Sequence, residues 1–231
     1  METVIKVNIS KSYGEKVVLD GFELTVSDGK ITALLGVSGS GKTTVLNAIC
    51  GTVDFEGTAS ADGAVSCIFQ SPRLAPWLTV SENLELVLRN FEKNKTVRRE
   101  KVAEMLKTVE LSGAAALYPH ELSGGMEQRV AIARAFLYPS AALLMDEPWR
   151  GLDIGLKKRL TAEFLKLFKE NPRSAIMVTH DLDDALMIAD RVAVLKNGKN
   201  VAEYEVPEKA HDLTSKESFE LRETLLKLVC D

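Results

Sequence analysis

The chain has 231 residues, of which 45% are hydrophobic and 27% are charged, and its formal net charge is −4. These values are ordinary for a globular protein with a sizeable core, and they argue against a surface built to attract nucleic acid or an anionic membrane. Its cysteines, Cys50, Cys67 and Cys230, are odd in number and widely spaced, which is typical of reduced cytosolic thiols. No run approaches the ~20 apolar residues of a membrane-spanning helix. We therefore expect a soluble intracellular domain whose membrane role, if any, comes through a partner.

The first third of the chain is predicted to begin with strands at residues 3–9, 17–26 and 31–35. A glycine-rich turn at 36–41 and a helix from about residue 42 to residue 50 follow. Residues 51–68, rich in small and polar side chains, read as a small antiparallel element.

The rest of the chain is predicted to alternate helices with strands. Helical stretches are expected at 79–118 and 124–138, and a closing helix, whose apolar residues should pack on the core, at about 215–229. Apolar strands recur at 143–145, 175–179 and 191–195, with helices between them, and Asn197-Gly198 is a hairpin signal. The alternation predicts a single α/β domain over residues 1–231 with a mainly parallel sheet, a small antiparallel β subdomain and a helical subdomain of about residues 75–135 inserted in the core.

A phosphate-binding loop is predicted between the strand at 31–35 and the helix after it. Gly36-Val-Ser-Gly-Ser-Gly-Lys-Thr43 fits the pattern GxxxxGK[ST], whose glycines let successive backbone N–H groups face one concavity at a helix N-terminus. Lys42 would reach the β- and γ-phosphates of a nucleotide, and Thr43 would offer its hydroxyl to Mg²⁺. The residues expected to bind nucleotide here are Gly36, Ser38, Gly39, Ser40, Gly41, Lys42, Thr43 and Thr44. The motif indicates a P-loop NTPase core.

Two acids end the apolar strand at 143–145. Asp146 would hold Mg²⁺, and Glu147 would orient and deprotonate an attacking water. Adjacent acids at a strand end are also common on ordinary surfaces, so this interpretation depends on the phosphate-binding loop.

The segment Leu122-Ser-Gly-Gly-Met-Glu-Gln-Arg129 resembles the signature motif of the ABC ATPase family. The order of motifs along nearly the whole chain resembles that family too, from Tyr13 through Gln70 to His180. The chain departs from the family pattern at Glu127, where a basic residue is usual, and at Trp149-Arg150, where phenylalanine and a small residue are usual.

The resemblance implies further roles. Tyr13 would stack on adenine, although a plain strand-end tyrosine is the alternative. Gln70 would contact Mg²⁺ and the attacking water, and His180 would touch the γ-phosphate, although a lone histidine there is more often structural. The remaining implied residues face the opposite subunit: Ser123, Gly124 and Gly125 at its γ-phosphate, and Asp153 in communication across the dimer.

The implied assembly is a dimer of two copies with ATP between one chain's phosphate-binding loop and the other chain's signature turn. Its further partners would be membrane permease subunits at the cytoplasmic face of the membrane and a solute-binding protein, with no nucleic acid. The sequence of residues Phe69–Asn83 resembles that of the ATPase subunits of importers for nitrate, sulfonate, taurine, bicarbonate or thiamine precursors.

Two alternatives stay open. One is an ABC ATPase that acts on ribosomes or DNA, although one phosphate-binding loop and no long coiled coil are present. The other is a nucleotide-binding module that does not hydrolyse, which the presence of Glu147 and His180 opposes. The solute and the choice of importer over exporter also stay open.

Overall fold

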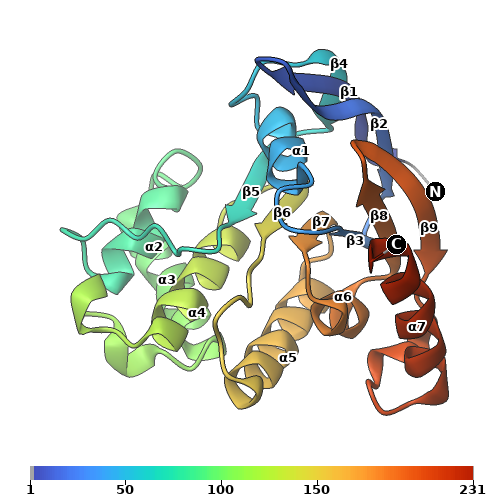
Figure 1. Ribbon diagram of the computed structural model, residues 1–231. Coiled ribbons are helices and arrows are strands. Elements are labelled where there is room, and N and C mark those ends of the chain that lie inside the picture. The colour runs from blue at the N-terminus through green and yellow to red at the C-terminus, as the bar shows by residue number, and fades with distance from the viewer. Residues whose placement is uncertain (1–2, 231) are drawn as a thin grey trace. The chain divides into compact units, whose positions relative to one another are not determined.

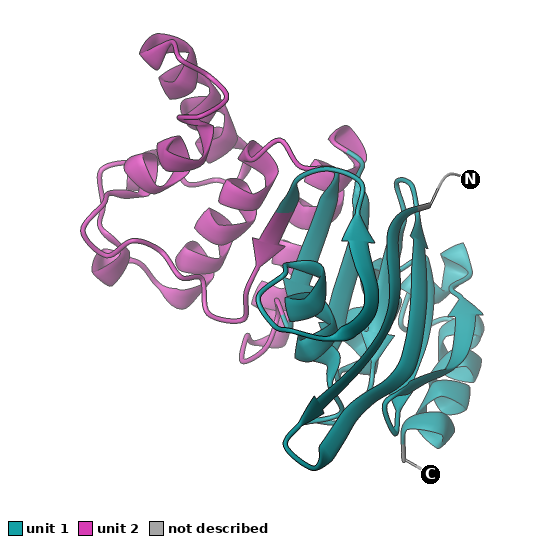
Figure 2. Ribbon diagram, turned by 90° about the horizontal axis from the view of Figure 1, so that it is seen from above, with its two compact units in different colours: residues 1–65, 141–147, 172–231 teal, residues 66–140, 148–171 magenta. Residues whose placement is uncertain are grey.

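The computed structural model describes residues 3–230 and divides into two compact units, coloured separately in Figure 2. Unit 1 comprises residues 1–65, 141–147 and 172–231. Unit 2 comprises residues 66–140 and 148–171. The chain therefore crosses from one unit to the other four times, once between Glu147 and Pro148.

Unit 1 contains a three-stranded antiparallel sheet in the order β2-β1-β4. Its strands are β1 (Thr3–Tyr13), β2 (Lys16–Ser27) and β4 (Glu56–Ala61). Side chains along β1 alternate, with Ile5, Val7 and Ile9 buried and Lys6 and Asn8 between them exposed to solvent, as one-sided packing requires. The antiparallel element predicted at residues 51–68 is confirmed for β4, which pairs with β1, but residues 65–68 form a strand outside this sheet.

Five strands of the second sheet belong to unit 1, in the order β6-β7-β3-β8-β9 (Figure 1). They are β3 (Ile31–Leu35), β6 (Ala142–Asp146), β7 (Ser174–Thr179), β8 (Arg191–Lys196) and β9 (Lys199–Glu205). Strand β3 pairs in parallel with β7 and β8, and every residue of β3 and β7 is buried, as in a sheet covered on both faces. The predicted parallel sheet is confirmed.

The hairpin between β8 and β9 has the left-handed backbone that its turn sequence favours. Asn197 has φ 50° and Gly198 has φ 77°, which matches the twist of an antiparallel pair. A further strand, β5 (Val65–Ile68), begins at the last residue of one stretch of unit 1 and continues into unit 2.

The helices of unit 1 are α1 (Lys42–Ile49), α6 (Leu182–Ile188) and α7 (Lys216–Cys230), with a short 3₁₀ turn at Glu208–His211. The expectation that the apolar residues of α7 pack on the core is confirmed for Leu225, which is fully buried. It is wrong for Phe219 and Leu226, which are exposed. These two lie seven residues apart and so share one face of the helix, away from the face of Leu225.

Unit 2 is mostly helical, as predicted for the middle of the chain. Its helices are α2 (Val80–Leu88), α3 (Lys95–Thr108), α4 (Gly124–Leu137) and α5 (Ile154–Glu170), with 3₁₀ turns at Ser112–Ala114 and Pro119–Glu121. A capping box starts α2, because the Thr79 and Glu82 side chains each bind the other's backbone N–H. Aromatic rings fill the interior: Phe164 packs edge-on against Trp149 and Phe136.

No helix among residues 3–230 is both long enough and apolar enough to cross a membrane.

Candidate functional site

The loop between β3 and α1 can only be made by glycine at two of its positions. Gly41 has φ 107°, and a Cβ there would lie 2.8 Å from Val18 Cγ1. A Cβ at Gly36 would lie 2.6 Å from the carbonyl oxygen of Leu195. No side chain caps the start of α1, so its first backbone N–H groups remain free to bind an anion. The hydroxyl of Ser40 is also buried there without a hydrogen-bond partner.

Lys42 supplies the positive charge of this loop. Its ammonium donates to the carbonyl oxygens of Gly36, at 2.8 Å, and Val37, at 2.9 Å, which folds the side chain over the loop. Burial lowers the pKa of Lys42, and the nearby carboxylates of Glu147 and Asp146 act in the opposite direction. A cation, two acids and free N–H groups therefore meet in one part of unit 1.

Two oxygen donors meet at the start of α1 and the end of β6. The Thr43 hydroxyl donates to Asp146 Oδ1 at 3.3 Å. Hydroxyl and carboxylate oxygens suit Mg²⁺, which takes few protein ligands and completes its shell with water and phosphate oxygens. Across the described residues no group of three or more His, Cys, Asp or Glu side chains could hold a metal by itself. The donor set thus fits a metal bound together with a nucleotide.

Glu147 and His180 form a pair that sequence reasoning did not predict. Glu147 Oε1 lies 2.9 Å from His180 Nδ1, and the Glu147 side chain is 12% exposed. The backbone of Glu147 is left-handed, with φ 44°, which is uncommon outside glycine. Its N–H donates to the carbonyl oxygen of Val178, one residue before the end of β7. The carboxylate that follows Asp146 is therefore aimed by its backbone and held by an imidazole.

Tyr13 lies half exposed at the end of β1, opposite Lys16. The Lys11 ammonium lies 4.9 Å from the centroid of its ring. Lys16 also lines a cavity of about 350 Å³, and two residues of the phosphate-binding loop, Val37 and Ser38, line the same cavity. Tyr13 itself does not line that cavity, so its adenine-stacking role stays a prediction.

Two of the predicted partner-facing residues of unit 2, Gly125 and Asp153, meet at Leu156 in the first turn of α5. Ser123 caps α4 by accepting from the Met126 N–H at 3.4 Å. A Cβ at Gly125 would lie 2.7 Å from Leu156 Cδ2, and Asp153 caps α5 by accepting from the Leu156 N–H at 3.0 Å. The signature turn and Asp153 thus belong to one packed corner, with Ser123 and Gly124 exposed.

Gln70 is exposed two residues after β5 in unit 2, whereas Thr43 and Asp146 belong to unit 1. Its predicted contact with Mg²⁺ stays a prediction.

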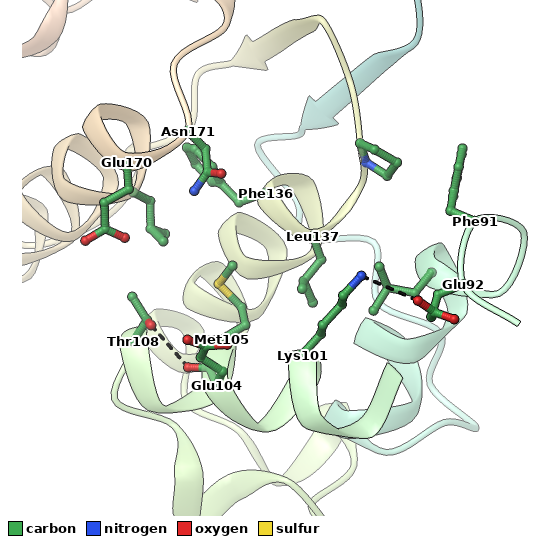
Figure 3. Close-up of a pocket in the computed structure, with 13 residues that line it drawn as sticks. Phe91, Glu92, Lys101, Glu104, Met105, Thr108, Phe136, Leu137, Glu170 and Asn171 are labelled. Atoms are coloured by element: carbon green, nitrogen blue, oxygen red, sulfur yellow. Dashed lines mark hydrogen bonds and ion pairs between the residues drawn. The ribbon is translucent and has the colours of Figure 1, made fainter. Parts of the chain in front are cut away.

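A cavity of about 440 Å³ lies among the helix ends of unit 2, and sequence reasoning did not anticipate it (Figure 3). Its lining mixes apolar side chains such as Met105 with an ion pair between Lys101 and Glu92 at 3.7 Å. None of the predicted site residues lines it.

Comparisons with known proteins indicate the family of the chain. A family model described as "ABC transporter" matches residues 19–150. The chain is 42% identical over 224 residues to the aliphatic sulfonates import ATP-binding protein SsuB of Delftia acidovorans, which covers 94% of this chain and 90% of that protein. It is also 38% identical over 212 residues to PhnT of Salmonella typhimurium, named for 2-aminoethylphosphonate import; this covers 86% of this chain and 58% of PhnT.

Among solved structures, the fold is similar to the dimeric structure of MJ0796, a bacterial ABC transporter cassette. The TM-score is 0.78 at 31% identity, covering 88% of this chain and 99% of that one. A post-hydrolysis dimer of the same cassette, bound to ADP and Pi, gives a TM-score of 0.76 at 29% identity over 88% of this chain and 99% of that one.

Proposed function

The chain belongs to the ABC transporter family, as an ATP-binding and ATP-hydrolysing subunit of an importer, and on that premise we propose which of its residues perform the reaction. The observation that carries the proposal is the pairing of Glu147 with His180 immediately after the strand end that brings Asp146 to Thr43. The relatives are named for import, so they support the importer and not the alternative of an ATPase that acts on ribosomes or DNA.

The phosphate-binding residues of unit 1 hold the nucleotide. The backbone N–H groups of the loop and the Lys42 ammonium bind the phosphate oxygens, which are the strong acceptors that a buried cation needs. Thr43 and Asp146 would hold Mg²⁺, with Gln70 as a further ligand. When bound, the metal would neutralise negative charge on the phosphate groups of the nucleotide.

Glu147 acts as the general base. Its carboxylate accepts a proton from the attacking water, and the left-handed backbone fixes the direction from which it does so. His180 orients this carboxylate through Nδ1, which leaves Nε2 free to contact the γ-phosphate. Tyr13 stacks on adenine.

The working assembly is a dimer of two copies, each placing Ser123, Gly124 and Gly125 at the γ-phosphate held by the other, with Asp153 beside that turn. ATP favours the closed dimer and hydrolysis favours the open one, so the membrane permease subunits respond to a shift in population. The helical subdomain of about residues 75–135 carries the signature turn. The dimer would lie at the cytoplasmic face of the membrane.

The transported solute is proposed to be a small organic oxyanion, a sulfonate or a phosphonate, delivered by a solute-binding protein. Relatives named for import of aliphatic sulfonates and of 2-aminoethylphosphonate support this class. The ATPase subunit does not bind the solute, so the test lies with its partners. The permease that co-purifies from native membranes identifies the paired binding protein, which calorimetry should find to bind one of these oxyanions; binding of nitrate or a thiamine precursor alone would contradict the proposal.

The Glu147→Gln variant tests the reaction. It keeps the side-chain shape but cannot accept the proton, so ATP turnover should fall on the order of a hundredfold or more. ATP should still bind, because Lys42, Thr43 and Asp146 are unchanged. Since hydrolysis reopens the interface, Mg-ATP should accumulate a dimer of this variant in size-exclusion chromatography with light scattering.

Glu208→Gln is the matched control, because Glu208 is exposed in a surface 3₁₀ turn of unit 1. It should hydrolyse ATP at the wild-type rate. A Glu147→Gln protein that also does so, or that stays monomeric with ATP, would contradict the proposed roles.

A further inference from the structure

Helix α4 holds the backbone that follows Glu147. Gln128, on its second turn, donates from Nε2 to the carbonyl oxygen of Pro148 at 2.7 Å. Gln128 is only 4% exposed, so this hydrogen bond is shielded from water. Removing the donor would leave the Pro148 carbonyl without this hydrogen bond and with little water to replace it.

The same helix holds the backbone that follows Gln70. Arg134 donates to the carbonyl oxygen of Pro72 at 2.7 Å and to that of Arg73 at 2.9 Å. Burial lowers the pKa of Arg134, so its charge is kept in a poorly solvated place where these two carbonyls are its acceptors. Arg73 itself has a left-handed backbone, with φ 48°. The fork of one guanidinium thus fixes two successive peptide groups of an irregular turn.

The Glu147 turn needs such support. A non-glycine residue persists in the left-handed region only where its surroundings over-determine it. Glu147 is held on one side by its N–H on the Val178 carbonyl. On the other side its next residue, Pro148, is held by Gln128. Loss of either hydrogen bond would let the carboxylate depart from the direction it has at His180.

We propose that Gln128 and Arg134 are positioning residues of the ATPase reaction, which from one helix hold the turn after the general base and the turn after Gln70. The inference rests on the proposed roles of Glu147 and Gln70. Since α4 begins at the signature turn, the element that faces the partner's γ-phosphate also carries the supports of these two turns. Neither residue needs to touch ATP.

The Gln128→Leu variant keeps the volume of the side chain and removes the donor. Turnover should fall on the order of tenfold to a hundredfold, as expected for a displaced catalytic group. The dissociation constant for ATP, measured by calorimetry, should be unchanged because the phosphate-binding loop is intact. Val102→Ala is the control for lost stability, since Val102 is buried on α3 and bonds to neither turn. Its turnover per folded molecule should match wild type.

The Gln128→Glu variant separates positioning from packing. Burial raises the pKa of the new carboxyl, whose protonated form donates to the Pro148 carbonyl and whose ionised form does not. The turnover of the variant, divided by that of wild type, should therefore rise as the pH falls from about 8.5 to about 5.5. Dividing by the wild-type turnover cancels the pH effects that both proteins share. A flat ratio would overturn the role of Gln128.

Arg134→Lys tests the second turn, because an ammonium keeps the charge but cannot match the planar fork on two carbonyls. Turnover should fall on the order of tenfold, with ATP affinity unchanged, and Arg134→Met should lower turnover further. Wild-type turnover in Arg134→Met would overturn the role of Arg134.

Trp149 reports the turn directly. It is fully buried next to Pro148, whereas Trp77 is 75% exposed and can be replaced by phenylalanine. In a Trp77→Phe background, Gln128→Leu should shift Trp149 emission to longer wavelength, and Val102→Ala should not.

The variants distinguish a wrong positioning role from a wrong assignment of the general base. If Glu147→Gln still hydrolyses ATP normally, the assignment of the base is wrong. If Glu147→Gln is inactive but Gln128→Leu and Arg134→Met turn over like wild type, the base stands and the positioning role is wrong.

Discussion

Two glycine-containing turns each open a helix, and they differ in how the helix start is satisfied. At α1 the first position is Gly41 in a left-handed conformation, with no side-chain cap and the Lys42 ammonium folded over the loop. At α4 the first position is Ser123 in an extended conformation, and its own hydroxyl caps the helix. The first turn of α1 carries no acid, whereas that of α4 carries Glu127.

The difference fits the roles proposed for the two turns: the first would bind an anion by itself, and the second would complete a site on the partner chain. The α1 turn has uncapped N–H groups and a cation, so it can hold phosphates without help. The α4 turn is already capped and has no lysine, so its contribution to phosphate binding alone is small. We therefore expect the first turn to decide whether ATP binds and the second to decide whether two chains meet.

The largest expected effect is that of Lys42→Ala. The phosphates lose the ammonium of the loop, so ATP binding should weaken on the order of a hundredfold or more. Isothermal titration calorimetry measures it, with Lys166→Ala on the exposed face of α5 as the control. Unchanged ATP affinity in Lys42→Ala would contradict the role of the α1 turn in binding phosphates.

Ser123→Arg should act on assembly alone. The long side chain would occupy the space of the partner's γ-phosphate, so no ATP-dependent dimer should form and turnover should fall on the order of a hundredfold. Each monomer should still bind ATP with wild-type affinity. Ser123→Ala, which removes the hydroxyl without adding bulk, should cost about 1 kcal/mol of unfolding free energy and still allow an ATP-dependent dimer. Light scattering distinguishes them, and a normal dimer of Ser123→Arg would place the signature turn outside the interface.

Replacing Gly41 or Gly125 by alanine compares how much each turn depends on glycine for its stability. Gly41→Ala puts a side chain at φ 107° and against Val18, so we expect a loss of about 2 kcal/mol or more in unfolding free energy. Gly125 has an ordinary helical backbone and meets only the flexible end of Leu156, so Gly125→Ala should stay within about 1 kcal/mol of wild type. Urea unfolding measures both. Equal losses would mean that packing rather than backbone conformation decides.

The smallest expected effect is at Tyr13, the residue predicted to stack on adenine. Tyr13→Ala should weaken ATP binding by about threefold to tenfold, and Tyr13→Trp should preserve it, because only the flat face is needed. Competition with GTP, whose base stacks as well, should show the same pattern. Equal ATP affinity in all three proteins would return Tyr13 to an ordinary strand-end residue.

The sequence predicted elements whose conformation depends on residues that are close together along the chain. The strand at 31–35 and the helix from residue 42 were found nearly at their bounds, because a buried apolar run, a glycine turn and a helix start lie side by side in sequence. The hairpin at Asn197-Gly198 was found because its turn type demands those residues.

Contacts between distant segments could not be predicted in this way. Gln128 donates to the Pro148 carbonyl oxygen, but nothing in the sequence distinguishes such a glutamine from one that is exposed to water. The bond between Glu147 and His180 depends on a left-handed backbone that no residue type announces. Phe219 and Leu226 were misplaced because an apolar stripe on a helix does not say whether anything covers it.

The pairing of β3 has a consequence for the order in which the protein can form during synthesis. The phosphate-binding loop is complete by Thr44, but Ile31 of the strand that supports it pairs with Ala175 and Thr32 pairs with Arg191. A ribosome releases those partners only late, after the helices of residues 80–137 have emerged. Because sheet pairing over such a span forms slowly, we expect a nascent chain to carry ordered helices well before it can bind a nucleotide. ATP can therefore stabilise the finished chain but cannot guide its early folding.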